Sequence, residues 1–246
     1  MSYQHDTIVP FGDSNKNKTD QVAEMFDNIA GRYDFLNHFL SAGIDIGWRK
    51  TAIKQLIPLH PQRILDVATG TGDVAIMAYK LLKPQQIIGI DISRGMLQIG
   101  NEKIQKLGLQ NVIQLVSGDS ETIMFDNDSF DGATVAFGVR NFEHLEEGLK
   151  EIKRVLKPGG KLVILEFSQP KLPFIKQVYK FYLNKVAPGI GGLISRNKSA
   201  YRYLNESVQK FPEGKTFVDI LSRLGYKNAS CKKLSLGIAS IYCGEK

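Results

Sequence analysis

The sequence predicts an α/β protein with a doubly wound, mostly parallel sheet of seven strands that ends in an antiparallel hairpin. Apolar stretches of strand length alternate with helical stretches from residue 63 to 167. A glycine-rich turn follows the first of these strands, and two short segments joined by a turn at Gly237 close the chain. Strands that alternate with helices of about ten to fifteen residues are joined by right-handed crossovers and therefore lie parallel.

The expected elements follow this rhythm in order. Strands are predicted at 63–68, 87–92, 112–118, 130–137 and 161–167, with helices at 73–82, 94–107 and 143–156 between them. After an insert, a helix at 216–224 leads to the last two strands at 228–237 and 238–246. The short turn between these strands predicts the hairpin. In such a sheet, ligands bind beyond the carboxyl ends of the strands, beside the first strand.

A helical cap precedes the sheet. The first residues are polar, with Asn and Lys interleaved, which predicts a flexible tail. Thr19 is expected to cap a first helix, and two more helical stretches, around 33–40 and 46–57, end at Pro58. The predicted units are a flexible tail (1–18), a helical cap (19–58) and a ligand-binding domain (59–246) with a helical insert (171–212).

Charge and hydropathy narrow the possible partners. The formal net charge is +7 and the pI is ≈ 9.2. This excess favours an anionic partner, either nucleic acid, a membrane surface or an acidic metabolite. No stretch reaches the roughly 18 consecutive apolar residues of a membrane span, and the N-terminus lacks the layout of a signal peptide. We therefore expect a cytoplasmic protein. The histidines and cysteines lack metal-ligand spacing, so no metal site is expected.

The turn after the first strand reads ILDVATGTGD, residues 64–73. Gly70 and Gly72 lack side chains, so the backbone can turn sharply and approach a ligand while the next helix begins at Asp73. Asp91 ends the second strand, where a carboxylate can accept both ribose hydroxyl protons. These residues predict a nucleoside-binding site.

The same spacing also fits the G-x-G-x-x-A fingerprint of nicotinamide-dependent oxidoreductases, and two residues weigh against that interpretation. Asp66 stands just before the loop, where a carboxylate repels a pyrophosphate but suits the cationic amino-acid end of S-adenosylmethionine. Asp119 follows the third strand and is placed to accept a hydrogen bond from an adenine amino group. The residues therefore favour a methyl donor.

Four segments, ILDVATGTGD, GIDIS, SGDSETIMFDNDSFD and LKPGGKL, together resemble class I S-adenosylmethionine-dependent methyltransferases over roughly residues 60–170. One departure is Ala68, which replaces the first glycine of the acid-x-Gly-x-Gly-x-Gly loop common in that class. The resemblance implies a Rossmann-like methyltransferase fold and S-adenosyl-L-methionine as methyl donor. The expected cofactor-binding residues are Asp66, Gly70, Thr71, Gly72, Asp91, Ile92, Met96, Asp119, Ser120 and Ala136.

A closer resemblance runs from about residue 21 to the C-terminus. FDNIAGRYDFLNHFLSAGIDIGWRK, AFGVRNF, LEFSQP and YRYLNESVQKFP are similar to the demethylmenaquinone and ubiquinone-pathway C-methyltransferases, and FG-V-R-N is the most specific block. This implies methylation of a ring carbon of a polyprenylated quinol, most simply demethylmenaquinol, with 2-methoxy-6-polyprenyl-1,4-benzoquinol as the alternative. Family members often have a cofactor-binding serine before the FG dipeptide, where this sequence has Ala136.

The chemistry of such an acceptor fits the AFGVRNF block. A quinol ring carbon is weakly nucleophilic until its neighbouring hydroxyl loses a proton, so the site must favour a phenolate. Arg140, expected to point toward the methyl group, is the candidate to stabilise this anion or to polarise a water that removes the proton. Asn141 is the candidate to hold the ring oxygen. Tyr33, Asp34 and Tyr203 are candidates to close the site, with ordinary packing as the competing interpretation of the two tyrosines.

The first part of the insert, 171–194, has apolar residues at helical spacing with lysines between them. A basic amphipathic helix suits peripheral contact with an anionic membrane surface, on the inner face of the cytoplasmic membrane, where an isoprenoid tail would stay. A helix that covers the sheet explains the same pattern, and both interpretations stay open.

Two other functions compete. The positive charge favours a nucleic-acid methyltransferase, but AFGVRNF occupies the place of the Asn/Asp-Pro-Pro-aromatic motif, and both cysteines lie too late for cytosine C5 chemistry. We therefore expect no nucleic-acid partner. A non-catalytic module would bind S-adenosylmethionine without turnover, and the intact AFGVRNF block argues against it.

Overall fold

The computed structural model describes residues 3–41, 43–170, 177 and 198–246. Within them, seven strands form one sheet in the order β3-β2-β1-β4-β5-β7-β6. The predicted doubly wound sheet is thereby confirmed. The strands are β1 (Arg63–Val67), β2 (Gln86–Asp91), β3 (Ile113–Ser117), β4 (Phe130–Ala136), β5 (Leu156–Phe167), β6 (Lys227–Leu234) and β7 (Ala239–Glu245).

The first five strands are parallel, and the chain reverses direction at the C-terminal edge. β7 pairs antiparallel with both β5 and β6. The turn between β6 and β7 is the short helix η4 (Ser235–Gly237), with φ of 95° at Gly237. The hairpin that the sequence predicts is therefore present. Because β1 pairs with β2 on one side and β4 on the other, the chain switches direction of winding beside β1.

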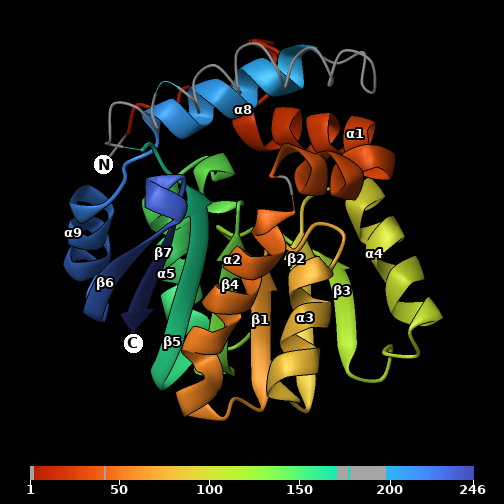
Figure 1. The fold of residues 1–246 in the computed structure, drawn as a ribbon, viewed down its shortest axis with the longest axis vertical. Helices are drawn as coiled ribbons and strands as arrows, with labels where there is room; N and C mark the ends of the chain where they lie inside the picture. The colour runs from red at the N-terminus through yellow and green to blue at the C-terminus, as the bar shows by residue number, and fades with distance from the viewer. Residues whose placement is uncertain (1–2, 42, 171–176, 178–197) are drawn as a thin grey trace.

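Helices cover both faces of the sheet (Figure 1). On one face, α2 (Ile44–Ile53), α3 (Asp73–Leu82) and α4 (Arg94–Lys106) bury one set of strand residues, such as Ile64 and Ile87. On the other face, α5 (Leu145–Val155) and α9 (Lys215–Arg223) bury the alternate set, such as Leu65 and Ile88. Successive strand residues point to opposite faces, so apolar residues in succession indicate burial on both.

A long helix lies across the carboxyl end of the sheet. α1 spans Lys18–Leu40, so the two separate helices expected around 19–29 and 33–40 are one. The predicted Thr19 cap is also wrong. Asn17 Oδ1 accepts from the Asp20 amide at 2.7 Å, because the Thr19 hydroxyl donates instead to Glu143 at 2.8 Å. The helix expected at 46–57 starts with α2 and continues as η1 (Lys54–Leu59).

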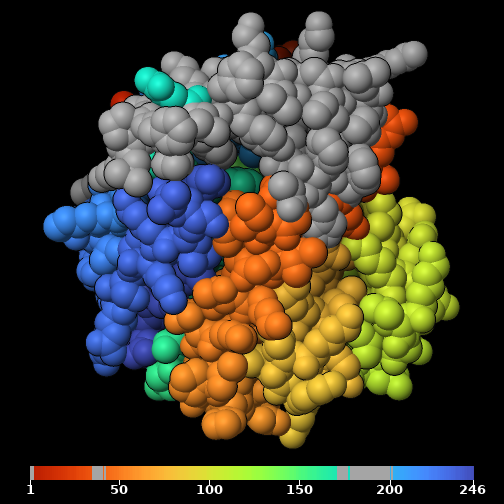
Figure 2. Space-filling view, viewed as in Figure 1, coloured from red at the N-terminus to blue at the C-terminus, as the bar shows by residue number. Residues whose placement is uncertain are grey.

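The C-terminal hairpin lies beside the helical cap. The Trp48 indole of α2 donates to the Ser235 hydroxyl of η4 at 2.8 Å. Figure 2 shows the orange residues of α2 between the blue C-terminal segment and the gold residues of α3. α8 (Lys198–Lys210) crosses above α1 in Figure 1. The amphipathic stretch predicted at 171–194 lies outside the described residues apart from Gln177.

The predicted flexible tail is packed onto the protein in its described part. His5 is fully buried, and its ring lies edge-on to Phe211 with 5.3 Å between centroids. The Tyr3 hydroxyl donates to Glu146 at 2.6 Å. The polar composition of this segment predicted flexibility because it did not show that His5 and Tyr3 pack against the rest of the protein. Among the described helices, none is both long and apolar enough to cross a membrane.

Candidate functional site

A cavity opens at the carboxyl end of the sheet, at the switch point beside β1, with ≈ 630 Å³ of empty space when the part open to solvent is included. Helix α1 forms one wall, and the loops after β1, β2, β3 and β4 form the other. The described residues that line it are Thr19, Val22, Phe26, Tyr33, Ala68, Gly70, Asp91, Ile92, Met96, Gly118, Asp119, Ser120, Glu121, Ala136, Phe137, Gly138, Asn141, Phe142 and Glu143.

The charged groups in this lining are all acidic. Asp91, Asp119, Glu121 and Glu143 line the cavity, and no Lys, Arg or His is among its described lining residues. Focused negative potential attracts cationic ligands and repels polyphosphates. The cavity of this basic protein is therefore suited to a cation.

The glycine loop adopts the sharp turn that its sequence predicts. Gly70 has φ of 57° and Gly72 has φ of 78°, a left-handed conformation that favours glycine. Ala68 has φ of 53°, so the alanine occupies a position where glycine would be less strained. A Cβ on Gly138 would lie 2.5 Å from the Ala68 Cβ. Gly138 of the AFGVRNF block thus lets the chain after β4 approach the loop closely.

Asp91 joins the glycine loop to the end of β2. Its Oδ2 accepts from the Gly70 amide at 2.7 Å, and its Oδ1 accepts from the Ser93 amide at 2.9 Å. Burial raises the pKa of Asp91 to about 6, against the lowering effect of the amides of Ser93 and Gly70. A carboxylate has about four acceptor positions, so Asp91 keeps capacity for hydroxyl donors in the cavity that it lines.

Asp66 lies behind the loop, and this corrects its expected placement against a cationic ligand. It is 1% exposed and is not among the lining residues. Its oxygens accept from the hydroxyls of Thr69 and Thr134, both at 2.6 Å. Burial raises the pKa of Asp66 to about 6, although both hydroxyls oppose the shift. Asp66 therefore fixes the loop to β4.

Asp34 and Thr71 also lie outside the cavity lining. The Thr71 hydroxyl donates to Asp34 at 2.5 Å, and Lys103 of α4 forms ion pairs with Asp34 at 2.5 Å and Asp73 at 2.7 Å. Asp34 was expected to close the site. It instead ties α1 to the glycine loop and to α4. Asp27 also ties α1 to α4, because it accepts from the Gly95 amide at the start of α4 at 2.8 Å.

Gly72 likewise lies outside the lining and shapes the turn from behind. It precedes α3 as the N-cap residue, and its amide donates to the Thr69 carbonyl at 3.0 Å. The other expected cofactor residues, Gly70, Ile92, Met96, Asp119, Ser120 and Ala136, line the cavity together with Asp91.

Three of the predicted substrate residues lie in the cavity lining or contact it. Asn141, in the short helix η2 (Val139–Asn141), lines the cavity, and its Oδ1 accepts from the Tyr203 hydroxyl at 3.0 Å. Burial raises the pKa of Tyr203, so its hydroxyl stays protonated and acts as a donor. Tyr33 also lines the cavity, and its ring lies edge-on to Phe26 with 5.7 Å between centroids.

Arg140 is buried in the core and does not line the cavity, contrary to prediction. It is 5% exposed and is not a lining residue. Its Nη1 donates to Glu166 Oε1 at 2.7 Å and to the Phe137 carbonyl at 2.6 Å. Burial raises the pKa of Glu166, while Arg140 lowers it. The sequence gives the position of Arg140 but does not show that a carboxylate on β5 pairs with it.

Sequence reasoning missed several lining residues on α1 and next to η2. Val22 and Phe26 follow an apolar helical period, which predicts a helix but does not show that they line a cavity. Thr19 and Glu143 both line the cavity and are joined by two hydrogen bonds, because the Glu143 Oε2 accepts from the Thr19 hydroxyl at 2.8 Å and from the Thr19 amide at 3.1 Å. The position of Glu143 directly after the RNF block was the available signal.

Comparisons with known proteins agree on one family. Residues 14–246 match the ubiE/COQ5 methyltransferase family. The chain is 46% identical over 246 residues to a demethylmenaquinone methyltransferase of Bacteroides fragilis, with all of both chains covered (100%). It is 48% identical over 230 residues to the ubiquinone/menaquinone biosynthesis C-methyltransferase UbiE of Geotalea daltonii, covering 93% of this chain and 97% of that one.

Solved structures agree on the fold. A S-adenosylmethionine-dependent methyltransferase of Thermotoga maritima, titled a possible histamine N-methyltransferase, has a TM-score of 0.62 at 20% identity, covering 91% of this chain and 99% of that one. With a sequence match over nearly the whole chain and the fold of a class I methyltransferase, the chain belongs to the ubiE/COQ5 methyltransferase family.

Proposed function

We propose that this protein transfers a methyl group from S-adenosylmethionine to a ring carbon of a polyprenylated quinol, with demethylmenaquinol as its acceptor and menaquinol as the product. The observation that carries the donor half is the acidic cavity at the switch point. The acceptor half rests on the AFGVRNF block and on the relative named demethylmenaquinone methyltransferase, which matches this chain from end to end.

The cavity residues fit S-adenosylmethionine better than a dinucleotide. Asp91 is available to ribose hydroxyls, and Asp119 and Ser120 line the cavity beside it, where they suit an adenine. Four carboxylates suit a cationic sulfonium, whereas they would repel a pyrophosphate, and no Lys or Arg of the described lining would offset that repulsion. When bound, S-adenosylmethionine would supply a methyl group activated by its sulfonium.

The residues beyond the glycine loop serve the acceptor. Asn141 offers an amide that can donate to a ring oxygen while its Oδ1 is held by Tyr203. Phe137 and Phe142 also line the cavity and provide an apolar surface for an aromatic ring. Burial of this ring would exclude water and favour attack by carbon over solvolysis. Helix α1, with Val22 and Phe26, covers the same space.

The proposal is tested with two acceptors under reducing conditions. Purified protein receives methyl-labelled S-adenosylmethionine with either a short-chain demethylmenaquinol or a prenylated methoxybenzoquinol. We expect label in the naphthoquinol product, at a kcat/KM at least about tenfold above that for the benzoquinol, since one shape-selective pocket gives about 1–3 kcal/mol of discrimination.

Faster labelling of the benzoquinol would contradict demethylmenaquinol as the acceptor and favour the methoxybenzoquinol. Binding of S-adenosylmethionine without labelling of either quinol would contradict the proposal and favour a non-catalytic module. Total RNA in a parallel reaction tests the nucleic-acid alternative that the net charge of +7 raises. Label in RNA, retained after washing in high salt, would overturn the quinol proposal.

A further inference from the structure

Lys18 is a buried cation at the start of α1, only 3% exposed. An ammonium group carries three N–H donors, and it is costly to bury unless these are used. The Lys18 Nζ lies 2.9 Å from the His5 carbonyl, 2.9 Å from the Phe142 carbonyl and 3.5 Å from the Arg140 carbonyl. Each of the three donors therefore has a main-chain acceptor.

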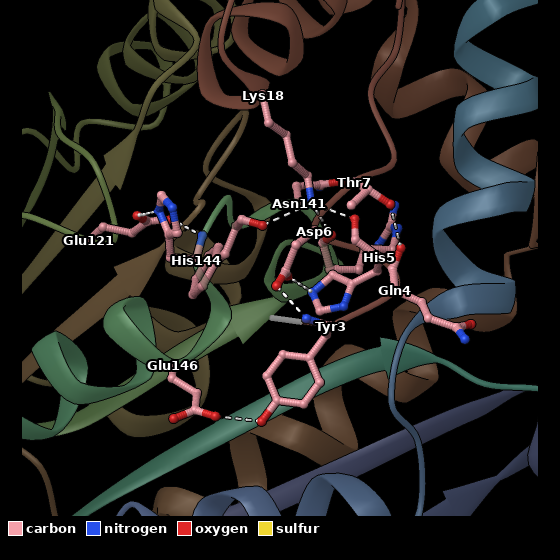
Figure 3. A network of polar contacts seen from close by, with 12 residues as sticks. Tyr3, Gln4, His5, Asp6, Thr7, Lys18, Glu121, Asn141, His144 and Glu146 are labelled. Atoms are coloured by element: carbon pink, nitrogen blue, oxygen red, sulfur yellow. Dashed lines mark hydrogen bonds and ion pairs between the residues drawn. The ribbon is translucent and has the colours of Figure 1, made fainter. Parts of the chain in front are cut away.

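Two of these carbonyls belong to the residues on either side of Asn141. Figure 3 shows Lys18 reaching from α1 toward Asn141 and the N-terminal segment. The Arg140 carbonyl belongs to the peptide group before Asn141, and the Phe142 carbonyl belongs to the peptide group after Phe142. A side chain that binds both carbonyls limits the backbone rotation of the two residues between them, Asn141 and Phe142. It thereby fixes the direction in which Asn141 enters the cavity, while Tyr203 fixes its amide.

The third carbonyl belongs to His5, so Lys18 also binds the N-terminal segment. This segment is anchored by Tyr3, whose hydroxyl donates to Glu146 and accepts from Arg223 at 2.7 Å. His5 is itself fully buried, so its carbonyl meets the Lys18 ammonium in the protein interior.

We propose that Lys18 is the positioning residue that holds Asn141 in its working orientation for methyl transfer to the acceptor. This inference rests on the proposed function. Lys18 does not line the cavity, so it acts through the backbone of the AFGVRNF block. The first residue of α1 would thus help to orient a residue of the AFGVRNF block.

The role depends on the charge of Lys18. Burial lowers the pKa of Lys18 to about 8; Asp6, Glu143 and Glu121 raise it, and Arg140 lowers it further. His5 contributes no positive charge near neutral pH, because burial lowers its pKa to about 3. A neutral amine has two N–H donors, so one carbonyl loses its partner as the pH rises through about 8. We expect kcat to fall on that alkaline side.

The test is a double-mutant cycle in the full-length protein, with Lys18→Met, Asn141→Ala and the double variant. Lys18→Met should lower kcat for demethylmenaquinol about tenfold, as expected for a loosened positioning group. Its Kd for S-adenosylmethionine should change less than about twofold. In the Asn141→Ala background the same substitution should change kcat less than about twofold, because coupled residues are not additive. Lys16→Met is the matched control, since Lys16 is exposed and paired only with Glu24 at 2.6 Å among the contacts described.

Equal effects of Lys18→Met in both backgrounds would overturn the proposal and leave Lys18 a purely structural role. If Lys18→Met fails to fold, Lys18→Arg serves as the second test variant. It should remain active, and its kcat should no longer fall at alkaline pH. A pH profile identical to that of the wild type would overturn the proposal.

A readout without turnover separates this inference from the proposed function. The side-chain amide resonances of Asn141 should titrate near pH 8 in the wild type and not in Lys18→Met. Resonances that ignore the pH would contradict the positioning role even if the quinol is methylated. Wild-type protein that titrates as expected but methylates no quinol would contradict only the proposed function.

Discussion

Arg140 and Glu166 form an ion pair in the protein interior, with 2.7 Å between Nη1 and Oε1. Both side chains are almost fully buried, at 6% and 0% exposed. The pair joins η2, which carries Asn141, to β5, and the Arg140 guanidinium also lies 5.6 Å from the centre of the Phe167 ring. The most distinctive arginine of the AFGVRNF block therefore supports the site from within the core.

Replacing Arg140 alone should destabilise the fold. Arg140→Met leaves the Glu166 carboxylate buried without its partner, and breaking a buried pair in this way costs about 3–5 kcal/mol. Urea unfolding followed by circular dichroism measures the loss. The double variant Arg140→Met/Glu166→Met should recover most of it, since an apolar pair of similar volume often replaces an ion pair without cost.

Turnover in the double variant then shows whether Arg140 has only a structural role or also acts directly in methyl transfer. Restored stability with restored turnover would show that Arg140 only shapes the site. Restored stability without restored turnover would favour the role expected from the sequence, in which Arg140 stabilises the anionic acceptor directly. A single variant as stable as the wild type would contradict the buried pair itself.

Asp91→Asn should weaken donor binding. Asp91 accepts from the Gly70 and Ser93 amides with separate oxygens, and an asparagine offers only one acceptor. Hydrogen bonds to charged groups contribute about 1.5–3 kcal/mol, so the Kd for S-adenosylmethionine should rise about 10- to 100-fold. Isothermal titration calorimetry measures it. Asp126→Asn, at an exposed carboxylate outside the cavity lining, should leave the Kd unchanged.

Tyr203→Phe should lower kcat while preserving the fold. The substitution removes the hydroxyl that donates to Asn141 and keeps the buried ring. A hydrogen bond of about 1 kcal/mol predicts a fall in kcat of about 5- to 10-fold. The matched control is Tyr226→Phe, which removes another buried hydroxyl, one that donates to the Leu149 carbonyl at 2.8 Å away from the cavity. Similar losses of turnover in both variants would argue against a specific role for Tyr203.

His5 should make stability fall in acid. Burial lowers the pKa of His5 from 6.5 to about 3, with Lys18 as the second cause. Below pH 6.5 the unfolded chain therefore binds a proton that the folded protein does not. The stabilising contribution is complete above pH 6.5, and acidification to pH 5 should remove about 2 kcal/mol of it.

Unfolding curves of the wild type and His5→Phe between pH 7 and 5 measure this contribution. Asp66 and Asp91 have the opposite sign, since their pKa values are raised to about 6 and their contribution is lost as the pH rises. Both aspartates are present in the wild type and in His5→Phe, so their contributions cancel when the free energies of unfolding of the two proteins are subtracted. A difference in stability that does not vary with pH would mean that His5 is solvated, and that the N-terminal segment does not pack as described.

The fold could be predicted from sequence because its signals are local. Strand and helix periods, the turn at Gly237 and the glycine loop each depend on neighbouring residues. The placements of Asp34, Asp66 and Arg140 could not, because each is fixed by a partner distant in the chain: Lys103, Thr134 and Glu166. The packing of the N-terminal segment could not be predicted for the same reason, since His5 packs against Phe211 and Lys18 binds the Phe142 carbonyl.

The position of the transferred methyl group tests the central claim most directly. Demethylmenaquinol is incubated with the protein and S-adenosylmethionine carrying a ¹³C-labelled methyl group, and the product is examined by NMR. We expect one new methyl signal, on the ring carbon next to a phenolic oxygen. Label on oxygen, or no label in the quinol while donor binding is intact, would contradict it.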